Sequence, residues 1–144
     1  MKSKKKIWIT LLVVIAVIGL SLLGGYLYLR YMPEKSMSKQ APDFSMTATK
    51  LAEEFETDPT AANSKFIDRV IEVTGVISEI STDQNNSIVF ILRENETATG
   101  VLCTVSEKSA KKTERYKVGE TVALKGICTG MLFEVVLNKC IIID

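Results

Sequence analysis

A run of 23 residues without a charged side chain, residues 7–29, constrains this chain more than any other feature. As a helix at about 1.5 Å per residue it would be about 34 Å long, enough to cross a hydrocarbon core of about 30 Å. Four lysines precede the run, and a basic flank stays in the cytoplasm. The sequence therefore predicts a cytoplasmic tail over residues 1–6, a transmembrane helix over residues 7–29, and the remainder of the chain outside the cytoplasm. Aromatic residues near the two ends of the run fit interfacial belts: Trp8, Tyr26, Tyr28 and Tyr31.

A cleaved signal peptide is the competing interpretation of the same run. The apolar region of a signal peptide normally covers about 7–15 residues and ends in a small-x-small cleavage site. Here the run is longer and no such site follows it, although cleavage near Gly24-Gly25 stays open. We therefore expect an uncleaved anchor. No lipobox-type cysteine follows the run, so the sequence does not indicate a lipoprotein.

Residues 30–45 are polar, contain two prolines and lack periodicity, which predicts a flexible linker. A coil of this length would reach about 20 Å on average. The rest of the chain, residues 46–144, forms the predicted exported domain. Outside the basic residues of the N-terminal segment, 13 Lys and Arg face 17 Asp and Glu, so the exported part carries a net charge of −4. Such a domain has no overall attraction for phosphate backbones.

The periodicity of apolar residues changes along the exported part. Helical spacing from Ala48 to Phe55 predicts one short helix, with Thr47 or Ser45 as its cap, and Asp58-Pro59 predicts the cap and first residue of a second. From residue 69 the period becomes two and β-branched residues dominate, which predicts strands. Five strands are expected, at residues 69–80, 88–93, 100–105, 119–128 and 133–143. A helical segment, residues 107–118, separates the third strand from the fourth.

Five strands with a helix between the third and the fourth follow the order of the OB-fold, a partly open Greek-key barrel. Gly75 lies inside the long first strand, where a glycine allows the bend that joins both sheets. In "VIEVTGVISEI", "KVGETVALKGICTG" and "EVVLNKCII" the chain resembles the tRNA_anti-like OB-fold family of small bacterial exported or membrane-anchored proteins, over residues 47–143. The resemblance implies a mainly β, five-stranded barrel with short N-terminal helices. It implies no particular partner, because the family name refers to a likeness to anticodon-binding domains.

The residue types argue against catalysis. The chain has no histidine, which removes the commonest general base, every Ser-His or Cys-His nucleophile pair, and most zinc sites. It also lacks a phosphate-binding glycine loop. We therefore expect no catalytic residues, no metal and no cofactor, and a binding or interaction module rather than an enzyme.

Nucleic acid binding is the alternative function, because OB-folds bind single strands by stacking bases on aromatic side chains of strands 2 and 3. Those strands offer only Phe90, which alternates with Ile88 and Leu92 and so is expected inside the barrel. The basic cluster at residues 108–117 lies on the helix expected to plug the barrel end, away from the usual groove. These features argue against a single-strand, tRNA-like or other polyanion ligand.

Five apolar residues are the candidate binding residues: Val89, Ile91, Met131, Leu132 and Phe133. The first two lie on the face of the second strand that alternates with the core face. Either the N-terminal helices cover that face, through Leu51, Phe55 and Phe66, or it forms an apolar groove for a peptide, a lipid or a partner domain. The other three lie in the expected loop between strands 4 and 5. They either fold under the barrel or form a contact patch.

Three cysteines complete the candidate residues. Cys128 and Cys140 lie in a predicted hairpin, in which Cys128 would be opposite Val135 and Cys140 about 17 Å farther along, too far for a disulfide. Cys103 and Cys140 could form a disulfide, because strands 3 and 5 of an OB barrel are neighbours and an exported domain meets oxidising conditions. The alternative is that all three are buried thiols.

Together, these patterns predict a single-pass protein of the inner membrane. Its N-terminus would be cytoplasmic and its OB domain periplasmic. The expected function is non-enzymatic binding of a protein or small-ligand partner.

Overall fold

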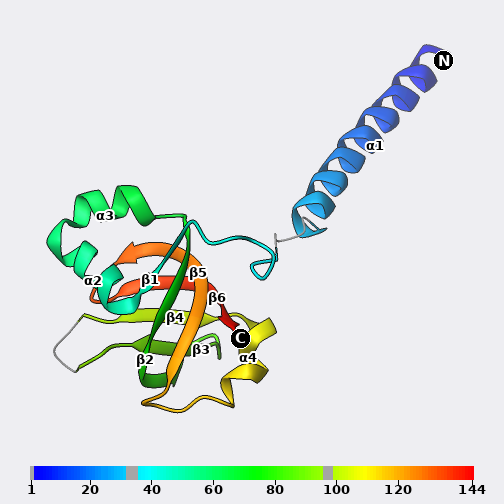
Figure 1. Cartoon of the computed structure of the whole chain (residues 1–144). Coiled ribbons are helices and arrows are strands. Elements are labelled where there is room, and N and C mark those ends of the chain that lie inside the picture. Colours follow the sequence, from blue (N-terminus) through cyan, green and yellow to red (C-terminus); the bar gives the residue numbers. More distant parts are fainter. Residues whose placement is uncertain (1, 32–35, 96–98) are drawn as a thin grey trace. The chain divides into compact units, whose positions relative to one another are not determined.

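A computed structural model of the chain describes residues 2–31, 36–95 and 99–144 (Figure 1). It contains two compact units, Met1–Glu34 and Lys35–Asp144. The described part of the first unit is one helix, α1 (Lys2–Tyr31), which includes residues 2–6 of the predicted cytoplasmic tail and extends two residues past the predicted membrane span. Residues 3–31 are long and apolar enough to cross a membrane, and a signal sequence meets the same criteria.

The second unit is a closed five-stranded barrel, which confirms the predicted OB-fold. Its strands are β2 (Val70–Thr82), β3 (Ile88–Leu92), β4 (Val101–Val105), β5 (Thr121–Met131) and β6 (Val135–Ile143). They pair in the order β2-β3-β4-β6-β5, and pairing of β5 with β2 closes the ring. β4 and β6 run parallel, whereas the other neighbours in the ring are antiparallel. The alternate residues of every strand therefore face either the enclosed core or the outside.

The long strand β2 serves two neighbours in succession. Its first half pairs with β5, from Val70 opposite Ile127 to Val76 opposite Thr121. Its second half pairs with β3, from Ile77 opposite Leu92 onward. Gly75 lies at this change of partner, and a β-carbon there would be 3.0 Å from Ala48 Cβ. The glycine thus admits the close approach of the helix that begins at Ala48, in addition to the bend that the sequence predicts.

A sixth strand, β1 (Phe44–Thr47), was not predicted. It runs parallel to β2, with Phe44 opposite Ile71 and Thr47 opposite Thr74. The predicted domain boundary at residue 46 therefore falls inside a strand. The chain contacts the barrel even earlier, because Asp43 exchanges two hydrogen bonds with Val70, at 2.8 and 2.9 Å. Lys125 Nζ also donates to the backbone oxygen of Gln40, at 2.8 Å. We call residues 40–43 the strap.

The helices α2 (Ala48–Thr57) and α3 (Pro59–Phe66) begin at the two predicted caps. The Thr47 hydroxyl accepts from the Lys50 amide at 3.2 Å, and the Asp58 carboxylate accepts from the Ala61 amide at 3.0 Å. Their large apolar side chains, Leu51, Phe55 and Phe66, are fully buried in the same core cluster as the inward residues of the barrel. They fill an end of the core, so the interpretation in which they cover the outer face of β3 is wrong.

The helix α4 (Glu107–Thr113) is shorter than the predicted segment and lies at a different end of the barrel from α2 and α3 (Figure 1). Ser109 and Thr113 are buried on its inner side. The following Tyr116 contacts the ring of Phe90 edge-on, with 6.4 Å between centroids. Phe90 is therefore inside the barrel, as its alternation predicts.

Gly126 is the position most sensitive to an added methyl group. A β-carbon there would lie 2.5 Å from Cys140 Sγ and 2.9 Å from the Asn138 oxygen. We expect Gly126→Ala to lower the free energy of unfolding by about 1–3 kcal/mol, because backbone on the facing strand has to move. Urea unfolding of the detergent-solubilised chain, followed by circular dichroism, measures this change.

Combining Gly126→Ala with Cys140→Ala should restore part of the lost stability, since the nearest atom is then gone. Gly24→Ala is the matched control, because nothing lies within 4 Å of the added carbon. Unchanged unfolding of the Gly126→Ala variant would contradict the close approach of β5 and β6.

Candidate interaction surface

An apolar row crosses the outside of the barrel over three strands. Ile91 of β3 is opposite Leu102 of β4, and Leu102 is opposite Val136 of β6. All three side chains are half-buried and alternate with core residues on their strands. We call these three residues the outer row. Ile91 therefore lies where the sequence predicts, on the face away from the core.

Val89 shares that face but is poorly available for contact. It lies between Ser81 and Thr104 of the neighbouring strands and keeps only 6% of its surface exposed. Val89 is therefore not a binding residue, contrary to the prediction, because a side chain this buried mainly stabilises the sheet.

The turn between β5 and β6 carries the most exposed apolar side chains of the described part of the domain. Leu132 is 84% exposed and Phe133 is 95% exposed. Met131, predicted in the same loop, is the last residue of β5 and packs half-buried against the core. Each of the two interpretations left open by the sequence therefore applies to part of the loop. Met131 folds inward against the barrel, whereas Leu132 and Phe133 point outward and form a candidate contact patch. We call the latter two the apolar tip.

The apolar tip is fixed at its base by polar contacts. Glu134 forms an ion pair with Arg93 at the end of β3, and the two side chains are only 14% and 26% exposed. The Leu132 amide donates to the Glu134 oxygen at 3.1 Å, and the Val135 amide donates to the Gly100 oxygen at 3.1 Å. The exposure of Phe133 therefore belongs to a held turn, so a partner would meet it with little loss of backbone freedom.

Arg93, Glu134 and the neighbouring Glu79 were not among the predicted site residues. Positions 93 and 134 are far apart in sequence, and nothing in either local pattern connects them. The sequence gives one weak indication for Glu134. It follows the apolar pair Leu132-Phe133 at a turn, and a charged side chain needs a partner if the turn packs against the barrel.

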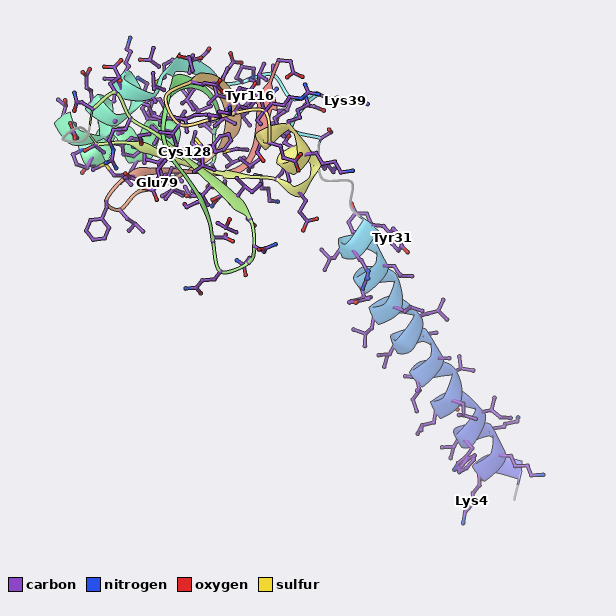
Figure 2. All side chains as sticks on the ribbon, turned by 90° about the horizontal axis from the view of Figure 1, so that it is seen from below. Lys4, Tyr31, Lys39, Glu79, Tyr116 and Cys128 are labelled. Atoms are coloured by element: carbon purple, nitrogen blue, oxygen red, sulfur yellow. The ribbon has the colours of Figure 1, made fainter. Side chains whose placement is uncertain are left out.

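Charge on this outer surface is not that of a phosphate-binding groove. Glu79 lies opposite Ile91, at one end of the outer row. Arg93 is paired with Glu134, so its positive charge is locally compensated. The helix α4, which carries exposed cations, lies away from Glu79 (Figure 2). Platforms on which bases stack normally combine aromatic side chains with a basic groove. Here the charge at the end of the outer row is the acidic Glu79.

The three cysteines are buried and present as free thiols. The β5–β6 register places Cys128 opposite Leu137 rather than Val135, because β5 continues to Met131, which itself faces Val135, and the turn is shorter than predicted. Cys140 is therefore three residues past the facing position, and the prediction that it does not bond Cys128 is unaffected. Burial raises the pKa of Cys140 well above its ordinary value, and the neighbouring Cys103 raises it further. Burial also raises the pKa of Cys128.

Comparison with known proteins places the fold. The family model described as tRNA_anti-like matches residues 1–142, which extends the resemblance through the N-terminal helix. No curated protein matches the sequence. A crystal structure of a lipoprotein from Klebsiella pneumoniae, for which nucleic acid binding is proposed, is 15% identical with a TM-score of 0.59. The match covers 77% of this chain and 98% of the lipoprotein. At this identity the likeness concerns the fold alone.

Weaker structural similarities involve parts of larger assemblies. Asparaginyl-tRNA synthetase from Pyrococcus horikoshii is 15% identical with a TM-score of 0.40, over 56% of this chain and 20% of the synthetase. The S. pombe Stn1-ten1 complex is 16% identical with a TM-score of 0.40, over 52% of this chain and 58% of that one.

The raised thiol pKa values predict slow alkylation of the folded protein. Because a raised pKa leaves less thiolate at a given pH, labelling at about pH 8 should be much slower than that of a free thiol. After unfolding without reductant, mass spectrometry should find three labelled cysteines. One labelled cysteine, with the other two joined, would instead establish the Cys103–Cys140 disulfide.

Proposed function

Because this chain belongs to the tRNA_anti-like family, we propose that it is a membrane-anchored, non-enzymatic OB-fold module that binds a partner protein through the apolar tip and the outer row. One observation carries the proposal: the 95% exposure of Phe133 on a turn fixed by the Arg93–Glu134 pair. Burying such a side chain contributes about 1.5–3 kcal/mol. Aromatic residues on preorganised surfaces are typical binding hot spots.

The chemistry of the surface favours an apolar protein partner. The outer row supplies three aliphatic side chains, and the tip supplies Leu132 and Phe133. The charged groups beside them are Glu79 and the compensated Arg93–Glu134 pair. A complementary surface would present aliphatic or aromatic side chains and would place no acidic group opposite Glu79. A polyanion would meet that carboxylate instead.

The location is part of the same proposal. The helix α1 is long and apolar enough to cross a membrane, and lysines precede its apolar part. The positive-inside rule then places the N-terminus in the cytoplasm and the barrel outside it, in the periplasm if the membrane is a bacterial inner membrane.

We expect a photo-crosslinking amino acid at position 133 to capture a specific protein in native membranes. The same amino acid at position 118 is the matched control, since Val118 is also exposed, at 60%, but lies next to α4. Phe133→Ser, combined with Leu132→Ser, should abolish capture from a probe at position 91 while leaving circular dichroism unchanged. Equal capture at positions 133 and 118, or binding of single-stranded RNA that depends on Phe133, would contradict a protein partner.

The orientation predicts the behaviour of C-terminal reporters. A fusion of alkaline phosphatase after Asp144 should be active in a bacterial host, because that enzyme needs the oxidising periplasm. A fluorescent protein that folds only in the cytoplasm should stay dark at the same position. Replacing the four N-terminal lysines with glutamines should reduce phosphatase activity, since the charge asymmetry sets the orientation. An active cytoplasmic reporter would reverse the proposed topology.

A further inference from the structure

The positive charge of the exported domain is concentrated on one short segment. Residues 108–117 contain five basic residues and one acidic residue, although the exported part as a whole has an acidic excess. We propose that the outer side of α4 and the turn after it dock on anionic lipid headgroups of the membrane that anchors the chain. This inference rests on the proposed membrane anchor, but its surface is separate from the apolar tip and does not depend on the partner proposed for the tip.

Four of the cations point away from the barrel and are available to a ligand. Lys108, Lys111, Arg115 and Lys117 are all exposed, and none forms an ion pair with another described residue. We call these four residues the basic face. The fifth cation, Lys112, pairs with Asp144 and lowers the pKa of that carboxyl group. Val118 follows the basic face and is 60% exposed, so an apolar side chain accompanies the cations. Cations next to an exposed apolar side chain are typical of surfaces that lie on membranes.

The strap lies on the side of the domain that carries the basic face. Lys125, which holds the Gln40 oxygen, is opposite Ile141 of β6. Three residues later, Asp144 pairs with Lys112 of α4. Figure 2 agrees, because Lys39 lies beside α4 whereas Glu79 lies toward the other side of the domain. The basic face and the point where the tether joins the barrel therefore lie on the same side of the domain.

The length of the tether would limit how far this side of the domain can move from the bilayer. Nine residue steps separate Tyr31, the last residue of α1, from Gln40. At about 3.3–3.6 Å per step they span at most about 30 Å. A short tether makes docking an intramolecular event at an effective concentration in the millimolar range. Weak contacts are then sufficient, and each basic residue near an anionic surface strengthens docking by about fivefold.

Charge elsewhere on the domain would set the orientation. With the basic face removed, the exported part is strongly acidic and is repelled by anionic lipid. Gly130, two residues before the apolar tip, lies beside the end of α3, because a β-carbon there would contact Asn63 and Ile67. As α4 is at a different end of the barrel, docking through the basic face would leave the tip accessible to a partner.

The test uses the full chain reconstituted into vesicles whose lipids carry a headgroup quencher. A fluorophore is attached at Val118→Cys beside the basic face, or at Thr60→Cys on α3, while the native cysteines are buried and stay unlabelled. With about 30% phosphatidylglycerol we expect at least twofold stronger quenching at position 118 than at position 60. The difference should vanish in pure phosphatidylcholine and at about 0.5 M salt.

Two charge-matched variants decide the role of the basic face. Lys111→Glu with Arg115→Glu should abolish the difference in quenching, whereas Lys50→Glu with Arg69→Glu, which changes the net charge equally on exposed residues elsewhere, should preserve it. Circular dichroism checks that both variants fold. Quenching that ignores lipid charge, or that survives the first variant, would overturn the proposal. So would binding of an oligonucleotide of about 12 nucleotides that requires Lys111 and Arg115, if anionic vesicles fail to engage them.

Discussion

The structure of the barrel domain depends on β2 changing partners halfway along its length. A closed barrel leaves no ring strand with an unpaired edge, but closure requires one strand to belong to both sheets. The first half of β2 is bonded to β5 on one edge and to the short β1 on the other, and its second half is bonded to β3. Gly75 at the change of partner, and Gly126 where β5 approaches β6, supply the space that this geometry needs.

Closure also decides which residues can bind. The inward side chains of the strands fill the interior, together with Leu51, Phe55 and Phe66 from the helices. These core residues therefore leave no room between them for a ligand. What remains for recognition is the outside: a row of aliphatic side chains, and a turn whose apolar residues have no place in the core. A small barrel filled in this way is suited to binding at its surface rather than within it.

The two proposed surfaces differ in chemistry and in position. The apolar tip offers shape and apolar area, held by an ion pair that is mostly shielded from solvent. The basic face offers charge that salt can screen and that a nearby anionic bilayer can attract. Lys125 fixes the strap at Gln40, and Lys39 lies on the side of the domain that carries α4, which is the side proposed to dock (Figure 2). A tethered module of this kind could be held and oriented by one surface while it binds with the other.

The sequence by itself determined the features that arise from local order. A run of uncharged residues marks α1, Thr47 and Asp58 cap the two short helices as predicted, and a period of two marks the five ring strands in OB order. These follow from backbone hydrogen bonding and side-chain alternation within a few residues of each position. Only the tertiary structure decided the role of residues 40–47, because the alternation of the four-residue strand β1 is too short to stand out in a polar linker, and the strand is stabilised by its pairing with β2. The same holds for the site. Val89 is buried, Met131 turns inward, and Phe133 is held in solvent by the pair of Arg93 and Glu134. All three results depend on contacts between distant segments, which local periodicity does not encode.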